Sequence, residues 1–380
     1  MHPVDLVIMS GFTDDGDAAR MVSGARRAIT RDLVARALSV GAFERIIVST
    51  NDAMLVDLLD PPVIVDLDHT EEPFQFGSRL HQLIQKYDIE RIVYMGGGAA
   101  PLASTDLMRV LAERVGVSDS LLLCNNFYSV DFCAFTPASC LLVAPPPKND
   151  NELGWLLGRR LGLPAEELER NAETTFDVDT PADLAVLALH PRTPPHTRTY
   201  LESLNLDLSR LETALDVFSS RGGQALISGR VGSRVLAHLE RYSACRTRVF
   251  SEERGMRADG RLARGEARSM VAMLMDALGV ERLFQEALPQ LCDAAFIDDR
   301  VLWAHRQVWP SPEDRFNSDL FRVERIQDPF TRAFTQAALN SPIPVILGGH
   351  SLVSGGMYVL VETAWARSER DYDRPVTSLG

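Results

Sequence analysis

The chain has 380 residues, of which 46% are hydrophobic and 24% are charged. This length predicts two domains, because a single hydrophobic core seldom serves more than about 250–300 residues. The 52 acidic residues outnumber the 39 Lys and Arg residues and give a net charge of −13. Such a charge argues against general binding to a nucleic-acid backbone. It is compatible with a local pocket for a small phosphorylated ligand.

The sequence lacks the features that secretion or membrane insertion would require. The N-terminus has an acidic residue and no basic region before a short apolar run, and no stretch approaches about 18 apolar residues. We therefore expect a cytoplasmic protein with no membrane partner, and the sequence does not indicate its oligomeric state. Free, reduced thiols are expected because the cysteines are odd in number and show no CxxC spacing: they are Cys124, Cys133, Cys140, Cys245 and Cys292.

The first half of the chain alternates short apolar runs with helical patterns. The alternation predicts a mostly parallel α/β sheet covered by helices, with its ligands at the carboxyl ends of the strands. In chain order we expect a strand at 4–9, a polar loop at 12–24, a helix at 31–40, strands at 45–52 and 63–66, a helix at 76–87, a strand at 91–95 and a helix at 105–115.

The composition changes near residue 190. Three prolines and few apolar residues at 190–198 predict a linker at 191–200, which would separate a domain of residues 1–190 from a second α/β domain of residues 201–380. In the second domain we expect helices at 204–218, 233–242 and 268–278 and strands at 224–228, 247–251, 294–297 and 343–347.

The most specific local motif is the sequence TFDVDTPADL at 175–184. Its Thr-Pro pair predicts a helix start, since proline is favoured at the first helical position and threonine at the cap. Asp183 complements the positive end of that helix. Asp177 and Asp179 would then lie at the mouth of a strand beside a helix N-terminus, where a divalent metal and a phosphate chain could be held. The alternative is that they only cap a turn.

This motif resembles the D-[IV]-D-T-P-x-D-L signature of the MobA-like and CofC-like nucleotidyltransferases, which share a GT-A-type fold. Earlier segments agree in order: 8–11 resembles the phosphate loop, 34–52 the following helix and strand, 96–102 the G-x-D-x-P-L turn, and 151–163 the late helix. The resemblance covers roughly residues 1–190. It implies a mostly parallel sheet of the nucleotide-diphospho-sugar transferase type, and Mg²⁺-dependent transfer of a nucleotidyl group from a nucleoside triphosphate to a phosphorylated small-molecule acceptor.

The resemblance also implies site residues. Asp179 and Arg20 would be catalytic, and Asp179 and Asp177 would bind the metal. The nucleotide would be bound by Ser10, Gly11, Gly97 and Gly98.

Two departures from the family pattern leave alternatives open. The phosphate loop is longer and acidic, and glycine or alanine stands at Gly98 or Ala99 where the family has a magnesium-binding aspartate. Asp14, Asp15 or Asp17 could supply the missing oxygen, or could form a solvated loop. The first domain could therefore be a degenerate transferase that binds a nucleotide or sugar phosphate without transfer. A glycosyltransferase-type DxD at 177–179 is a weaker alternative, because that motif usually follows a mid-domain strand.

Each predicted strand of the second half is followed by a polar cluster. The carboxyl ends of parallel strands share one edge, so we expect these clusters to converge on one pocket for an anionic phosphorylated or carboxylated substrate. A third hypothesis for the function therefore places the chemistry in residues 201–380. The alternative is that these side chains only pair with one another. The expected pocket residues are Arg230, Glu253, Arg254, Asp298, Arg300 and His350.

Overall fold

A computed structural model describes residues 2–13, 15–68 and 73–372. The chain forms two compact units, each organised around its own sheet. The first unit contains residues up to 13, 23–177 and 194–200, and the second contains 14–22, 178–193 and 201 onward. Within the described residues, no helix has the length and apolar character needed to cross a membrane.

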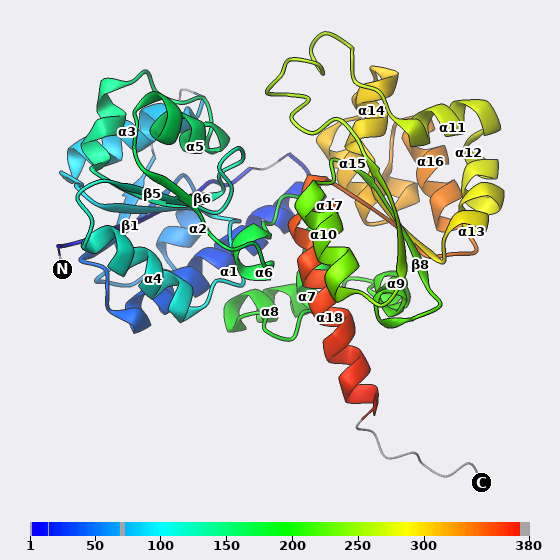
Figure 1. The fold of residues 1–380 in the computed structure, drawn as a ribbon, viewed down its shortest axis with the longest axis horizontal. Helices are drawn as coiled ribbons and strands as arrows, with labels where there is room; N and C mark the ends of the chain where they lie inside the picture. Colours follow the sequence, from blue (N-terminus) through cyan, green and yellow to red (C-terminus); the bar gives the residue numbers. More distant parts are fainter. Residues whose placement is uncertain (1, 14, 69–72, 373–380) are drawn as a thin grey trace. The chain divides into compact units, whose positions relative to one another are not determined.

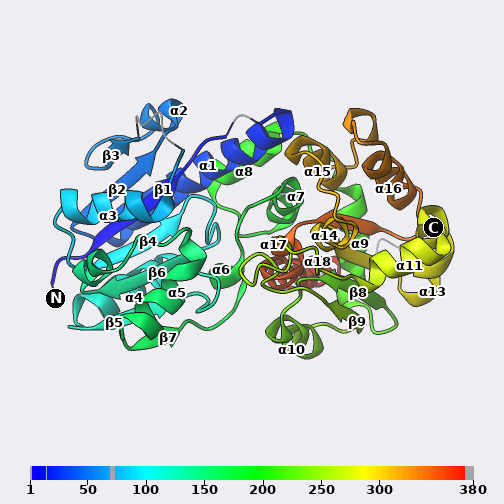
Figure 2. The ribbon, with the colours of Figure 1, turned by 90° about the horizontal axis from the view of Figure 1, so that it is seen from above.

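The first unit is built on a seven-stranded sheet of order β3-β2-β1-β4-β6-β5-β7. β1 lies between β2 and β4 and is parallel to both, whereas β6 runs antiparallel to β4 and β5 (Figure 2). This mixed, mostly parallel sheet confirms the predicted fold class. The strands are β1 (Asp5–Ser10), β2 (Arg45–Thr50), β3 (Ile64–Leu67), β4 (Ile92–Gly96), β5 (Leu121–Cys124), β6 (Phe132–Thr136) and β7 (Ala165–Glu167).

Helices cover both faces of this sheet. Figure 1 shows α3 and α5 on one side and α1 and α4 on the other. On the α3 side the core packs Val7 and Ile47 of the strands against Leu80 and Leu83 of α3. The helices are α1 (Asp17–Val40), α2 (Ala53–Val56), α3 (Phe76–Lys86), α4 (Thr105–Gly116), α5 (Leu153–Trp155) and α6 (Ala172–Thr175), with short 3₁₀ or π turns at Ala138–Val143, Asp150–Glu152 and Leu156–Arg160.

The second unit is built on a four-stranded parallel sheet of order β11-β10-β8-β9. Its strands end level with one another, because Gly229 pairs with Ser251 and Asp298 with Gly348. The strands are β8 (Gln224–Gly229), β9 (Arg246–Ser251), β10 (Ala294–Asp298) and β11 (Val345–Gly348).

Two groups of helices enclose the second sheet. One face carries α9, α10 and α18, and the other packs apolar residues of α11, α14 and α16 against β8, β10 and β11 (Figure 1). The helices are α7 (Pro181–Leu189), α9 (Ser209–Ser219), α10 (Ser233–Tyr242), α11 (Met270–Leu278), α12 (Val280–Arg282), α13 (Leu288–Leu291), α14 (Arg300–Arg306), α15 (Pro312–Asp319), α16 (Pro329–Leu339), α17 (His350–Val353) and α18 (Gly355–Tyr372), with further 3₁₀ or π turns at Leu283–Ala287 and Val323–Arg325.

Two expected elements differ from the structure. The polar loop predicted at 12–24 ends earlier, because α1 begins at Asp17. The strand expected at 175–179 is a single antiparallel bridge between Asp177 and Ala99, which follows the end of α6. The strands predicted at 224–228, 247–251, 294–297 and 343–347 are confirmed to within about two residues.

The expected linker at 191–200 is partly helical, which corrects its predicted structure. Residues Pro195–Ser203 form α8. The buried carboxylate of Asp32 accepts hydrogen bonds from the backbone of His196 (3.1 Å) and Thr197 (2.8 Å) and from the Thr197 hydroxyl (2.7 Å), so it stabilises the start of this helix. The compact units also divide the chain differently from the expected boundary, with 178–193 in the second unit. Independent folding of 1–190 and 201–380 stays a prediction.

Candidate functional site

In the first unit, the ends of β1 and β4 pack directly against each other. The backbone N–H of Gly97 donates to the carbonyl of Met9 (2.8 Å), and a side chain on Gly97 would collide with Ser10. The Ser10 hydroxyl is buried and accepts a hydrogen bond from Thr30 (3.0 Å). Ser10 and Gly97 are therefore buried against each other at this edge of the sheet. Gly11 is exposed and Gly98 is half-exposed.

Asp177 lies beside the glycine-rich turn that follows β4. Asp177 forms an isolated antiparallel β-bridge with Ala99, and the N–H of Ala100 donates a hydrogen bond to the carbonyl of Phe176 (3.1 Å). These bonds fasten the start of the DVDTP segment to the turn at 96–98. Of the two expected metal ligands, Asp177 is the one that belongs to the first unit.

The two expected catalytic residues belong to segments of the second unit. Arg20 lies in the first turn of α1, where its guanidinium pairs with Asp17. Asp15 is exposed, Asp17 also pairs with Arg325 (3.3 Å), and Asp14 lies outside the described residues. Asp179 is exposed and precedes Thr180, the cap of α7. Among the residues that the structure describes, no group of three or more His, Cys, Asp or Glu side chains could hold a metal ion.

Asp183 completes the start of α7. One of its carboxylate oxygens accepts hydrogen bonds from the N–H groups of Asp179 (3.1 Å) and Thr180 (2.7 Å) and from the Thr180 hydroxyl (2.9 Å). Full burial, reinforced by the nearby charge of Asp179, raises the pKa of Asp183 to about 7. Thr180 and Asp183 thus form a capping box at the start of α7, where the sequence predicts a helix start.

In the second unit, the first pair at the sheet edge joins β8 to β10. Arg230, directly after β8, donates from Nε (2.6 Å) and Nη2 (3.0 Å) to the buried carboxylate of Asp298 at the end of β10. Gly229 adopts φ +123°, and a side chain there would collide with Asp298. Although burial acts to raise the pKa of Asp298, Arg230 and its other cationic neighbours hold that pKa below its usual value.

A second buried ion cluster follows β10. Arg300 donates to Asp299 (2.7 Å) and to both carboxylate oxygens of Asp319 (2.5 and 2.7 Å). Burial raises the pKa of Asp299 above its usual range. The charge of Arg300 is therefore matched within the protein, and it still helps to lower the pKa of Asp298.

His350 lies within electrostatic range of the Arg230–Asp298 pair. Burial, and next the charge of Arg230, lower the pKa of His350 to about 4, so its imidazole is neutral at pH 7. Its buried Nδ1 has no hydrogen-bond partner among the described residues. The charges of Asp179 and Arg254 also act on this pKa.

Of the six residues expected in one pocket, Arg230 and Asp298 are in direct contact. The charge of Arg300 acts on Asp298, and that of Arg254 acts on His350. The carboxylate of Glu253 is instead bound by Arg261 (2.8 Å for each oxygen) and by the N–H of Arg268 (3.0 Å). The structure adds Asp179, which the sequence pattern assigned to the first domain.

Three further residues of this edge were not selected from the sequence. Arg257 and Arg315 both lie over the ring of Trp309, at 5.5 and 5.0 Å from its centroid. Burial lowers the pKa of both arginines, and charges of neighbouring arginines lower it further. Arg257 follows β9 in the same polar cluster as Arg254, so its place at this edge could have been predicted from the sequence. Trp309 and Arg315 follow α14, and nothing in their local sequence indicates that they lie at this edge.

The sequence matches no protein-family model and no curated protein. About half of the chain is similar to solved nucleotidyltransferase structures. A cytidylyltransferase from Leptospira borgpetersenii is 14% identical with a TM-score of 0.39, over 54% of this chain and 94% of that one. A nucleotidyl transferase from Methanothermobacter is 15% identical with a TM-score of 0.39, over 53% and 99%. A CMP:2-keto-3-deoxy-manno-octonic acid synthetase, solved with CTP, is 14% identical with a TM-score of 0.33, over 48% and 95%.

Proposed function

We propose that the first unit binds a nucleoside triphosphate and transfers its nucleotidyl group to a phosphorylated small molecule. The observation that carries this proposal is the pairing of Asp177 with Ala99, which fastens the DVDTP segment to the glycine-rich turn after β4. That turn packs on the end of β1 through Gly97 and Ser10. Parallel α/β sheets bind ligands at this edge of their strands, and the exposed Gly11 and half-exposed Gly98 leave backbone groups there for a phosphate chain.

Mg²⁺ would be expected for such a transfer, because a divalent cation offsets the charge that develops on the reacting phosphates. The described residues do not form a metal site by themselves, and Asp177 and Asp179 belong to different compact units. This observation favours a second candidate function, in which the unit binds a nucleotide or sugar phosphate without transfer.

The test uses the full chain with ATP, GTP, CTP and UTP, each with and without Mg²⁺. Thermal unfolding measures binding, since a ligand at 100 times its dissociation constant stabilises the folded state by about 2.7 kcal/mol. Release of pyrophosphate measures transfer, with a panel of phosphorylated acceptors. Stabilisation without pyrophosphate supports the binding candidate, and neither signal with any nucleotide refutes both.

A variant of one motif carboxylate, Asp179, sharpens this test. Asp179→Asn should lower turnover by about two orders of magnitude or more while leaving the unfolding temperature nearly unchanged, because Asp179 is exposed. Asp106→Asn is the matched control, since Asp106 is an exposed acidic residue in α4 that pairs with Arg109. An unchanged rate in Asp179→Asn would mean that Asp179 takes no part in the transfer.

A further inference from the structure

The topology of the second sheet singles out one position on its edge. The order β11-β10-β8-β9 means that the chain leaves β8 toward one side and returns to the other side at β10. In open parallel sheets the crevice at the carboxyl ends of such neighbouring strands is the usual place for a ligand. Arg230 and Asp298, which pair with each other, follow these two strands.

The arginines of this edge differ in whether a carboxylate forms an ion pair with them. Arg230 and Arg300 are paired with buried aspartates. For Arg254 and Arg257, by contrast, no ion-pair partner is found within the described part of the chain. Arg257 is exposed, and the charges of Arg230, Arg300, Asp179 and Asp298 act on it. An exposed guanidinium that no carboxylate pairs with can bind an anion from solution through paired hydrogen bonds.

Two features place further positive charge beside Arg254 and Arg257. Arg315 shares the ring of Trp309 with Arg257, and its guanidinium donates a hydrogen bond to the neutral carbonyl of Pro310. The guanidinium of Arg254 lies against Gly232, 3.4 Å from where a Cβ would stand. Gly232 is the cap residue of the ten-residue helix α10 and provides no side-chain cap, so the N-terminal N–H groups of that helix add to the positive potential.

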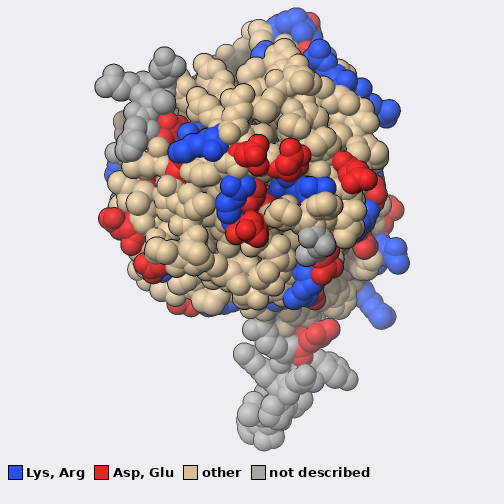
Figure 3. All heavy atoms as spheres, turned by 90° about the vertical axis from the view of Figure 1, so that its left-hand side faces the viewer, with Lys and Arg blue, Asp and Glu red and all other residues tan. Residues whose placement is uncertain are grey.

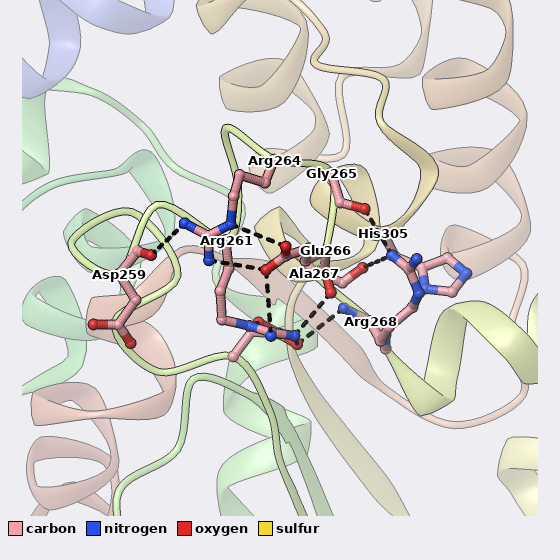
Figure 4. A network of polar contacts seen from close by, with 10 residues as sticks. Asp259, Arg261, Arg264, Gly265, Glu266, Ala267, Arg268 and His305 are labelled. Atoms are coloured by element: carbon pink, nitrogen blue, oxygen red, sulfur yellow. Dashed lines mark hydrogen bonds and ion pairs between the residues drawn. The ribbon is translucent and has the colours of Figure 1, made fainter.

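The loop that carries Arg254 and Arg257 is held in place by its own polar contacts (Figure 4). Glu253 binds Arg261 through two hydrogen bonds, and Glu266 binds Arg264 through two more (2.9 Å each). The guanidinium of Arg268 donates to the carbonyls of Gly265 (2.9 Å) and Ala267 (2.7 Å). A loop fixed in this way presents its arginines with little loss of conformational freedom when a ligand binds.

We propose that the carboxyl edge of the second sheet is a binding site for a phosphorylated small molecule, with Arg257 and Arg254 as the principal contacts of the phosphate. Planar guanidinium groups bind tetrahedral oxyanions through paired hydrogen bonds, and several of them converge here from separate loops. The Arg230–Asp298 and Arg300–Asp319 pairs fix the walls of the site.

The test measures binding of inorganic phosphate to the full chain by calorimetry at constant ionic strength, with acetate as the comparison anion. Arg257→Gln should weaken phosphate binding at least about tenfold, the value of a charge-assisted hydrogen bond. Arg282→Gln is the matched control, because Arg282 is an exposed arginine that pairs with Glu286 one helical turn away. It should bind phosphate as the unmodified protein does.

A second measurement separates a binding role from a structural one. Without phosphate, Arg257→Gln should unfold at nearly the same temperature as the unmodified protein, because an exposed arginine without a carboxylate partner contributes little to stability. A lower unfolding temperature would overturn the proposal, since it would mean that the protein itself satisfies Arg257. Equal binding of acetate, an equal loss in Arg282→Gln, or unchanged phosphate binding in Arg257→Gln would overturn it as well.

Discussion

Removing the cation of the Arg230–Asp298 pair tests the electrostatics of the second unit. Asp298 is 1% exposed and receives two hydrogen bonds from the guanidinium of Arg230. In Arg230→Ala the backbone N–H at position 230 is the only donor among the described residues that still reaches that carboxylate (3.3 Å). Breaking a buried pair on one side lowers the free energy of unfolding by about 3–5 kcal/mol. For a unit of about 200 residues this corresponds to a decrease of about 6–20 °C in the unfolding temperature.

Tryptophan fluorescence is the suitable assay, because three of the four tryptophans belong to the second unit: they are Trp303, Trp309 and Trp365. The loss should depend on pH in a defined direction. The pKa of Asp298 is held below its usual value in the intact pair, so the stabilisation is present above about pH 4 and disappears as the pH falls through that lowered pKa. Arg230→Ala and the unmodified protein should therefore converge in stability in acid.

A double variant provides the refuting result. Arg230→Ala with Asp298→Asn should recover most of the lost stability, because no unpaired charge then stays buried. If the two substitutions are additive, or if Arg230→Ala costs less than about 1 kcal/mol, Asp298 is not a charge that depends on Arg230. The assignment of Arg230 as a matched arginine would then be wrong.

Three further predictions follow from single buried groups. Asp32→Ala removes three hydrogen bonds at the start of α8 and should speed limited proteolysis within residues 191–200, as measured by mass spectrometry of the fragments. Asp183→Asn should flatten the pH dependence of the unfolding temperature between about pH 4 and 7, because a carboxyl whose folded pKa is about 7 destabilises the fold as the pH rises through this range. Glu253→Gln should weaken phosphate binding several-fold by calorimetry while Glu286→Gln leaves it unchanged, because Glu253 positions the arginine-bearing loop through Arg261.

The strands of both units could be predicted because their apolar runs are buried on both faces. β1 is buried along its whole length, as are β10 and β11, and such runs are typical of parallel sheets. Helix α8 could not be predicted in the same way. Its first turn is stabilised by Asp32, which lies 164 positions away from His196 in the sequence. A local sequence pattern cannot indicate a helix cap that comes from so distant a residue. The segment predicted as a linker at 191–200 therefore contains the start of a helix that its composition did not indicate.

The distribution of charge over the surface could not be predicted from the composition. On the face seen in Figure 3, Lys and Arg side chains lie among Asp and Glu side chains rather than forming one continuous field. The surplus of acidic residues in the whole chain therefore gave no information on where local positive charge gathers. In the second unit it gathers where several loops meet at one sheet edge, a property of topology and not of composition.

The second-unit cluster shows which part of a site follows from order along the chain and which part does not. Residues directly after parallel strands must share an edge, so the proximity of Arg230, Asp298 and His350 follows from strand order alone. The same rule cannot separate Glu253 from Arg254, which are neighbours after one strand. Glu253 adopts a left-handed backbone conformation with φ +52°, and its side chain binds Arg261 within the loop. Because that carboxylate is engaged there, Arg254 keeps an unmatched charge beside Gly232, and the edge becomes a place for an external anion.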